Sequence, residues 1–255
     1  MMANAQPEAP VTCWLVGDTG WFGPAGLLEG FLDALESASL VPDRYGRDER
    51  HMKPFTRRGM LAMRPKAAGR EWFVAFARDA APAYDGSIFS RQTSTVRFRC
   101  CEPDDTSRRL IFELGDHLAR FARPRLAAAS TSLHQADPAP GRDETLTWIK
   151  ASSNIHQPYL RQYGLIGLAP RTYFGPDIVE LIGRARIDAL ALPMHWFDDG
   201  TVRIDLVPEP WNAAPEDLVE PWRAAMEILR PSEVFSTGHV TASGMLIPRR
   251  GKRWV

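Results

Sequence analysis

The pattern of apolar and polar residues predicts both strands and helices. Residues 11–16 form a short apolar run typical of a buried strand, and 71–77 and 94–100 are further strand candidates. Apolar residues recur at helical spacing from Pro24 to about Ser37 and from Asp105 to Arg123. The second helix follows Asp104, a residue type that commonly caps helix N-termini. The first half of the chain therefore alternates strands with two amphipathic helices.

The last third of the chain has clearer boundaries between its elements. Residues 165–173 are expected to form a strand that ends near Phe174, and Gly175-Pro176-Asp177 begins a short helix. Residues 190–207 predict a β-hairpin, because Asp198-Asp199-Gly200 supplies a tight turn between two apolar segments. A last helix is expected over 215–229, with a kink or a later start at Pro221.

Three segments lack regular periodicity. Residues 43–70 carry nine Arg or Lys against three acidic residues and are expected to form loops or short irregular elements. Residues 127–143 are rich in Ala, Ser and Pro and are interpreted as a mobile segment, while 248–255 is expected to be a frayed tail. Core-like sequence lies on both sides of 127–143. We therefore predict one domain over 1–255, of the α/β (or α+β) class, with a mixed or antiparallel sheet flanked by helices.

Charge and cysteine content exclude several classes of protein. Basic and acidic residues balance at 31 each, so nucleic-acid binding driven by bulk charge is not expected. The three cysteines, Cys13, Cys100 and Cys101, suit a reducing compartment better than a disulfide framework. The first ten residues lack the features of a signal peptide, and no apolar stretch is long enough to span a membrane. We expect a soluble, cytoplasmic protein.

The glycine-rich segment after the first strand suggests one enzymatic alternative. Gly17, Gly20 and Gly23 have the spacing of the phosphate-binding turn of extended short-chain dehydrogenases. However, no second strand carrying a ribose-binding residue follows at the required distance, and no tyrosine has a lysine four positions later. Pro24 also removes an amide donor from the turn. An NAD(P)-dependent reductase is therefore kept as the alternative, with a structural strand-to-helix turn favoured.

Other catalytic and metal-binding patterns are missing from the sequence. The six histidines show no ligand spacing, and Asp116 and His117 would point about 100° apart on one helix. His195 lies in an apolar run and suits a hydrogen-bonded sheet residue. No Gly-x-Ser-x-Gly motif is present. We therefore expect no catalytic residue, no cofactor and no metal, and interpret the chain as a binding protein that is not an enzyme.

One acidic segment favours a macromolecular partner. Residues 198–220 contain seven acidic residues against the single basic Arg203, and Trp211 lies among them. Carboxylates can steer a basic partner, and an indole can anchor it. The alternative is that the acids belong to a turn and a helix start and that Trp211 is a core residue. The candidate partner-binding residues are Asp198, Asp199, Asp205, Glu209, Trp211, Glu216 and Asp217.

Three segments resemble a known family. Arg171–Pro176, Val202–Pro208 and Pro210-Trp211, followed by a helix with Met226 and Leu229, are similar to the bacterial polymorphic-toxin immunity proteins of the immunity protein 52 family. The resemblance covers roughly residues 148–237.

This resemblance implies a cytoplasmic antidote to a toxin secreted, for example, by a type VI secretion system. Such a protein would bind the basic face of the toxin's nuclease domain and occlude the active site of that domain. It would make no direct contact with nucleic acid or membrane. No catalytic residue would be carried over. A structural protein of a phage or mobile element, which would form higher oligomers, is a third possibility.

Overall fold

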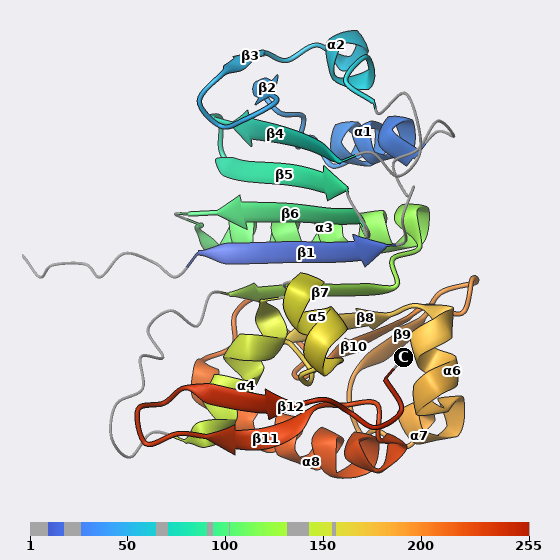
Figure 1. The fold of residues 1–255 in the computed structure, drawn as a ribbon. Helices are drawn as coiled ribbons and strands as arrows, with labels where there is room; N and C mark the ends of the chain where they lie inside the picture. The colour runs from blue at the N-terminus through green and yellow to red at the C-terminus, as the bar shows by residue number, and fades with distance from the viewer. Residues whose placement is uncertain are drawn as a thin grey trace, which may run out of the picture.

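The computed structural model describes residues 10–17, 27–64, 71–90, 94–101, 103–131, 143–154 and 157–254. Within these residues, ten strands form one sheet that runs through the molecule (Figure 1). In spatial order the strands are β3 (Met52–Pro54), β2 (Arg44–Gly46), β4 (Trp72–Arg78), β5 (Tyr84–Ser90), β6 (Ser94–Cys100), β1 (Val11–Gly17), β7 (Leu126–Thr131), β8 (Arg171–Phe174), β10 (Val202–Asp205) and β9 (Met194–Trp196). Neighbouring strands pair antiparallel throughout.

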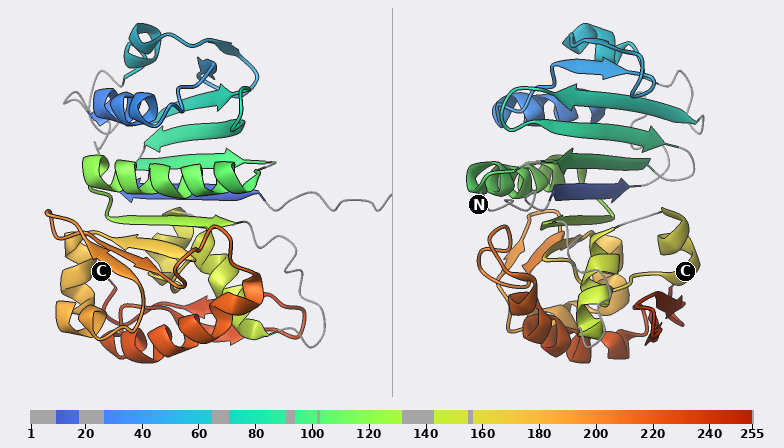
Figure 2. Two further views of the ribbon diagram at one scale, coloured as in Figure 1. Left: turned by 180° about the vertical axis from the view of Figure 1, so that it is seen from behind. Right: turned by 90° about the vertical axis from the view of Figure 1, so that its left-hand side faces the viewer.

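Helices cover the two halves of this sheet from opposite sides (Figures 1 and 2). The first half has α1 (Leu27–Ser37), α2 (Arg57–Leu61) and α3 (Asp105–Ala122). The second half has α4 (Glu144–Ser153), α5 (Gln157–Tyr163), α6 (Pro176–Ile182), α7 (Arg184–Asp188), α8 (Val219–Leu229), the short 3-10 helices Pro215–Leu218 and Arg230–Ser232, and a separate hairpin of β11 (Thr237–Val240) and β12 (Leu246–Arg249). The predicted class, an α/β domain with a helix-flanked antiparallel sheet, is confirmed.

Side-chain alternation along the strands creates two cores. In β1, Cys13 and Leu15 join the core beneath α1 and α3, while Val16 joins the core on the other face with α4, α6 and α8. Successive strand residues point to opposite faces, so one short apolar run can serve both cores. β1 therefore contributes side chains to both cores, and the strand order places it between β6 of the first half and β7.

The structure confirms the elements with strong local signals. The Asp104 carboxylate accepts the backbone N–H of Ser107 at 2.7 Å and caps α3, which ends at Arg123 in the left-handed conformation. The predicted hairpin forms from β9 and β10, with Gly200 at a positive φ of 87°. Pro221 lies in the first turn of α8, where proline is tolerated.

Residues 127–143 were expected to be mobile, and for 127–131 this expectation is wrong. They belong to β7, a buried strand between β1 and β8. Ala127 and Ala129 face the core beneath α3, and Ala128 faces the other core. Small side chains allow both layers to approach this strand closely, so the Ala-rich composition reflects tight packing. Residues 132–142 lie outside the described residues.

The expected frayed tail over 248–255 also differs from the structure. Pro248 and Arg249 pair in β12, Gly251 is buried, and Trp254 is only 5% exposed. The strand expected over 165–173 is shorter, because only Arg171–Phe174 joins the sheet. The sequence analysis also did not anticipate β5 and the β11–β12 hairpin. No helix among the described residues has the length and apolar character needed to cross a membrane.

Candidate functional site

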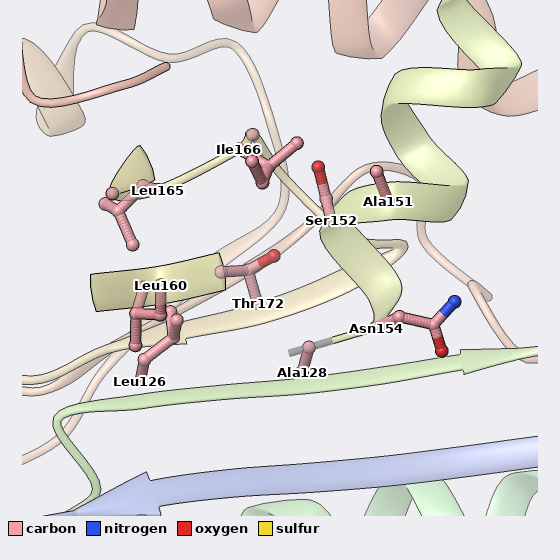
Figure 3. Close-up of a pocket in the computed structure, with 11 residues that line it drawn as sticks. Leu126, Ala128, Ala151, Ser152, Asn154, Leu160, Leu165, Ile166 and Thr172 are labelled. Atoms are coloured by element: carbon pink, nitrogen blue, oxygen red, sulfur yellow. The ribbon is translucent and has the colours of Figure 1, made fainter. Parts of the chain in front are cut away.

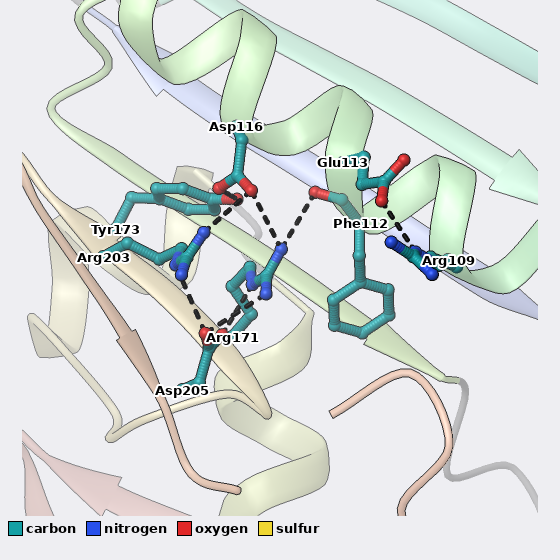
Figure 4. A network of polar contacts seen from close by, with 8 residues as sticks. All are labelled: Arg109, Phe112, Glu113, Asp116, Arg171, Tyr173, Arg203 and Asp205. Carbon is teal, nitrogen blue, oxygen red and sulfur yellow. Dashed lines mark hydrogen bonds and ion pairs between the residues drawn. The ribbon is translucent and has the colours of Figure 1, made fainter. Parts of the chain in front are cut away.

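The segments that resemble the immunity family meet on one face of the sheet. Strands β8 and β10 pair antiparallel, with Arg171 opposite Asp205 and Tyr173 opposite Arg203. Because alternate residues share a face, these four polar side chains all point toward α3 (Figure 4). Two strands that lie about 30 residues apart in the chain thus build a charged cluster between the sheet and a helix.

Arg171 is the centre of this cluster. Its Nε and Nη2 atoms donate to Asp205 Oδ1 and Oδ2 at 2.5 and 3.1 Å, a bidentate arrangement. Its Nη1 atom donates to the carbonyl oxygen of Phe112 at 3.2 Å and to Asp116 Oδ2 at 3.3 Å. Both Arg171 and Asp205 are buried. The pair therefore links β8 and β10 to α3.

Asp116 connects the buried pair to the surface. Its Oδ1 atom accepts the Tyr173 hydroxyl at 2.8 Å, and its Oδ2 atom accepts Arg203 Nη1 at 2.8 Å. Arg203 Nε also forms an ion pair with Asp205 Oδ2 at 3.2 Å. The side chains of Arg203 and Asp116 are 25% and 19% exposed, so the cluster is accessible to solvent at this side (Figure 4).

Burial controls the protonation of this cluster and of Cys13 in β1, whose thiol is influenced by the charges of Asp116 and Arg171. Burial raises the pKa of Cys13 to about 12, with a further contribution from Asp116. It also raises the pKa of Tyr173, again with Asp116 adding to the shift. Burial alone would lower the pKa of Arg171, but the hydrogen bond to Asp205 and the neighbouring groups raise it. At neutral pH the thiol and the phenol thus keep their protons, and the cluster suits structural cross-linking better than nucleophilic chemistry.

Trp211 covers the cluster. Its ring packs on Phe112 at a centroid distance of 6.2 Å and an interplanar angle of 68°. The guanidinium groups of Arg109 and Arg171 lie 5.9 and 5.7 Å from the ring centroid. Trp211 is half-buried, so its contacts with α3 are internal, and its role as an anchor for a partner remains a prediction.

The structure divides the predicted acidic residues between two places. Asp198 and Asp199 lie in the turn before β10, while Glu209, Glu216 and Asp217 follow its end. Figures 1 and 2 show the hairpin turn and the segment after β10 at opposite ends of that strand. The acids therefore do not form one rim around Trp211.

The exposure of these acids also differs. Asp198, Glu209, Glu216 and Asp217 are exposed, and Asp217 accepts the backbone N–H of Ala214 at 3.2 Å.

Two of the acids make internal contacts. Asp199 is half-buried and accepts the backbone N–H of Thr201 at 3.0 Å. Asp205 requires a correction: at 2% exposure, with its carboxylate bound by Arg171, it cannot contact a partner directly.

The role of Asp116 was not predicted, because the sequence pairs this residue only with the neighbouring His117. The available signal was spacing, because Arg109, Phe112 and Asp116 recur at intervals of three and four on one helix face. All three contact the cluster or the ring of Trp211. Across the described parts of the chain, no group of three or more His, Cys, Asp or Glu side chains is arranged to hold a metal ion.

The glycine-rich turn is described only at its first residue. Gly17 ends β1, while Gly20, Gly23 and Pro24 lie outside the described residues. The reductase alternative requires a parallel sheet behind this turn. β1 instead pairs antiparallel with both β6 and β7. The pairing of β1 therefore does not favour the dinucleotide-binding alternative.

A partly open pocket lies on the other face of the sheet, between α4, α5, β7 and β8 (Figure 3). Three side chains bring polar atoms to the lining, and each is bonded to backbone: Ser152 donates to Trp148 O, Asn154 donates to Lys150 O, and Thr172 accepts from Ala169 N. The lining residues include no titratable side chain, so the pocket does not suit acid–base chemistry. They are Leu126, Ala128, Ala151, Ser152, Asn154, Leu160, Gly164, Leu165, Ile166, Gly167 and Thr172.

Comparison with known proteins gives a likeness in fold and none in sequence. No family model and no curated protein matches the sequence. Among solved structures, the chain is similar to the T6SS (type VI secretion system) protein PA0821 of Pseudomonas aeruginosa, with a TM-score of 0.56 and 13% sequence identity. The match covers 87% of this chain and 76% of that chain. At this identity the likeness shows a shared fold.

Proposed function

We propose that this chain is an immunity protein, which binds a cognate secreted toxin in the cytoplasm and neutralises it by occluding its active site. In this proposal the chain is not an enzyme and needs no cofactor. The toxin is expected to be a nuclease with a basic face, and the chain would contact neither nucleic acid nor membrane.

One observation carries the proposal: the fold likeness to a T6SS protein over 87% of the chain. Such systems deliver toxins, and a producing cell needs a protein that protects it from its own toxin. The resemblance of Arg171–Pro176, Val202–Pro208 and Pro210-Trp211 to the immunity protein 52 family points to the same role. In β8, in β10 and at Trp211 these residues build the Arg171–Asp205 cluster, so in this proposal they hold the scaffold and do not contact the toxin through that cluster.

The surface chemistry is compatible with binding by occlusion. A sheet cross-linked to α3 through buried charges presents its loops on a rigid support, which lowers the entropic cost of association. Asp198, Glu209, Glu216 and Asp217 are exposed and would attract a basic surface. A nuclease surface that binds phosphates has this charge.

The proposal is tested by co-expression. The product of the neighbouring gene is expressed in a host with and without this chain, and growth is followed. Relief of growth arrest by this chain, together with a complex of the two proteins in size-exclusion chromatography, is the expected result. Growth arrest that persists in the presence of soluble, folded chain would contradict the immunity function.

A further inference from the structure

The second face of strands β4, β5, β6 and β1 is not covered by any described element. Helices α1 and α3 both lie on the opposite side of these strands, as the front view and the side view agree (Figures 1 and 2). In the second half of the sheet the corresponding face is covered by α4, α5 and α6. We call the uncovered region the open face, and define it by Trp14, Phe73, Asp85, Phe89, Arg97 and Arg99.

The strand register places these side chains beside one another. Trp14 lies opposite Arg97, and Arg99 lies opposite Asp85. Phe89 lies opposite Phe73 at the other end of the same strands. The open face therefore has a polar region with a tryptophan and two arginines next to an apolar pair, and all six side chains are partly accessible to solvent.

The two arginines lack the partners that other partly buried arginines have. Within the described residues, neither Arg97 nor Arg99 makes a hydrogen bond or an ion pair through its guanidinium group, and Arg97 Nε is buried without a partner. The Arg97 guanidinium lies over the Trp14 ring, at 5.2 Å from the centroid. By contrast, Arg171 and Arg203 are both paired with carboxylates. Asp85 lies near both arginines and Glu49 lies near Asp85, but neither carboxylate forms a hydrogen bond or a close ion pair with the two guanidinium groups.

We propose that the open face is a second docking surface for the toxin, in addition to the exposed acids, and that the toxin segment docked on it carries carboxylates. This inference rests on the proposed function and specifies where the partner binds. Trp and Arg are enriched at the centres of protein interfaces, where a partly desolvated guanidinium gains most from a carboxylate. Two arginines within a chain of balanced charge are too few for a nucleic-acid surface, which needs a run of basic residues.

The test compares two double charge reversals in the co-expression and binding assays. Arg97→Glu with Arg99→Glu is expected to weaken the complex by at least about tenfold and to abolish protection from growth arrest. The matched control is Arg184→Glu with Lys252→Glu, which makes the same charge change on exposed residues of α7 and of the C-terminal segment. It should leave affinity and protection unchanged. Trp14→Ala should also weaken the complex.

Three outcomes separate the possible failures. If the unmodified chain gives no protection, the proposed function fails, whatever the variants do. If the unmodified chain protects and the Arg97/Arg99 reversal binds as tightly as the control, the docking inference is wrong. If labelled single- or double-stranded oligonucleotides bind the unmodified chain at physiological salt and lose binding on reversal, the face belongs to nucleic acid, and the docking inference is again wrong.

A milder variant guards against loss of folding. Arg97→Gln with Arg99→Gln removes both charges without introducing repulsion, and circular dichroism checks that the fold is retained. A folded Gln variant that binds the toxin with unchanged affinity and unchanged salt dependence would overturn the inference.

Discussion

Arg171 and Asp205 face each other on neighbouring strands and are joined by two nitrogen–oxygen contacts of 2.5 and 3.1 Å, in a region where both side chains are almost fully buried. The same guanidinium bonds the Phe112 carbonyl and the Asp116 carboxylate of α3. A single arginine thus fixes two strands to a helix. Buried charge of this kind is stable only while every partner is present.

Replacing one partner should therefore be costly. Asp205→Asn keeps the shape of the side chain but leaves Arg171 without its main counter-charge. We expect the free energy of unfolding to fall by about 3–5 kcal/mol, measured by urea denaturation. The matched control is Asp198→Asn on the exposed hairpin turn, expected to change stability by less than about 0.5 kcal/mol. Equal stability of the two variants would show that the pair does not hold β10 to α3.

Gly86 provides a second test of packing. It lies opposite Phe76 in the sheet, and a Cβ atom at this position would lie 2.2 Å from a ring carbon of Phe76, which is completely buried. Gly86→Ala is expected to lower the free energy of unfolding by about 1–3 kcal/mol through overpacking, despite the better strand propensity of alanine. Ser87→Ala changes the following residue, which lies on the open face, and serves as the control. Thermal melts of both variants should show a clear loss of stability for Gly86→Ala and little change for Ser87→Ala.

The buried thiol of Cys13 should make the free energy of unfolding fall as the pH rises into the alkaline range. Burial raises its pKa from 9.0 to about 12 in the folded state, so above pH 9 the unfolded chain loses a proton that the folded chain keeps. Stability is therefore lost as the pH rises from about 9 toward 12. Between pH 8 and 10 this group alone accounts for about 1 kcal/mol.

Cys13→Ala isolates this contribution. Tyr84 and Tyr173 also have raised pKa values, but they are present in both proteins, so the difference in pH slope reports Cys13. Urea denaturation at pH 8 and pH 10 should show a smaller loss of stability for the variant than for the unmodified chain. Identical slopes would mean that the thiol is as accessible in the folded state as in the unfolded state.

The acids on either side of β10 allow a prediction about binding. Reversing Asp198, Asp199 and Glu209 to lysine should weaken the complex with the toxin and reduce its salt dependence, if these carboxylates meet a basic surface. The matched control reverses three other exposed acids, Glu144, Glu180 and Glu227, to lysine. Unchanged affinity in calorimetric titrations over a range of salt concentrations would remove these three residues from the interface formed by Asp198, Asp199 and Glu209.

The sequence predicted those parts of the fold that local chemistry determines. The cap at Asp104, the turn before β10 and the apolar face of α8 each lie within a few adjacent residues, and all three are present. It did not predict β7, because an Ala-rich run has weak strand propensity and becomes a strand only between β1 and β8.

The candidate site was harder to predict for a related reason. Asp205 and Asp198 belong to one acidic segment, and nothing local distinguishes the buried acid from the exposed one. The difference lies in Arg171, 34 residues earlier, which reaches Asp205 only once β8 and β10 have paired. The open face was missed for the opposite reason, because Arg97 and Arg99 alternate with core residues as solvent-facing residues do.

Trp254 offers the most direct test of how the chain ends. The sequence predicted a frayed tail, but the indole is 5% exposed, packs beside Gly164 and lies 5.2 Å from the Arg125 guanidinium. Trp254→Ala should therefore lower the free energy of unfolding by about 3–5 kcal/mol in urea denaturation. Lys252→Ala removes only the exposed pair with Glu233 and should cost less than about 1 kcal/mol. If both variants unfold at the same urea concentration as the unmodified chain, the tail is frayed. Deleting a packed indole ring would leave a cavity and lower the stability, so unchanged stability would mean that the ring is not part of the core.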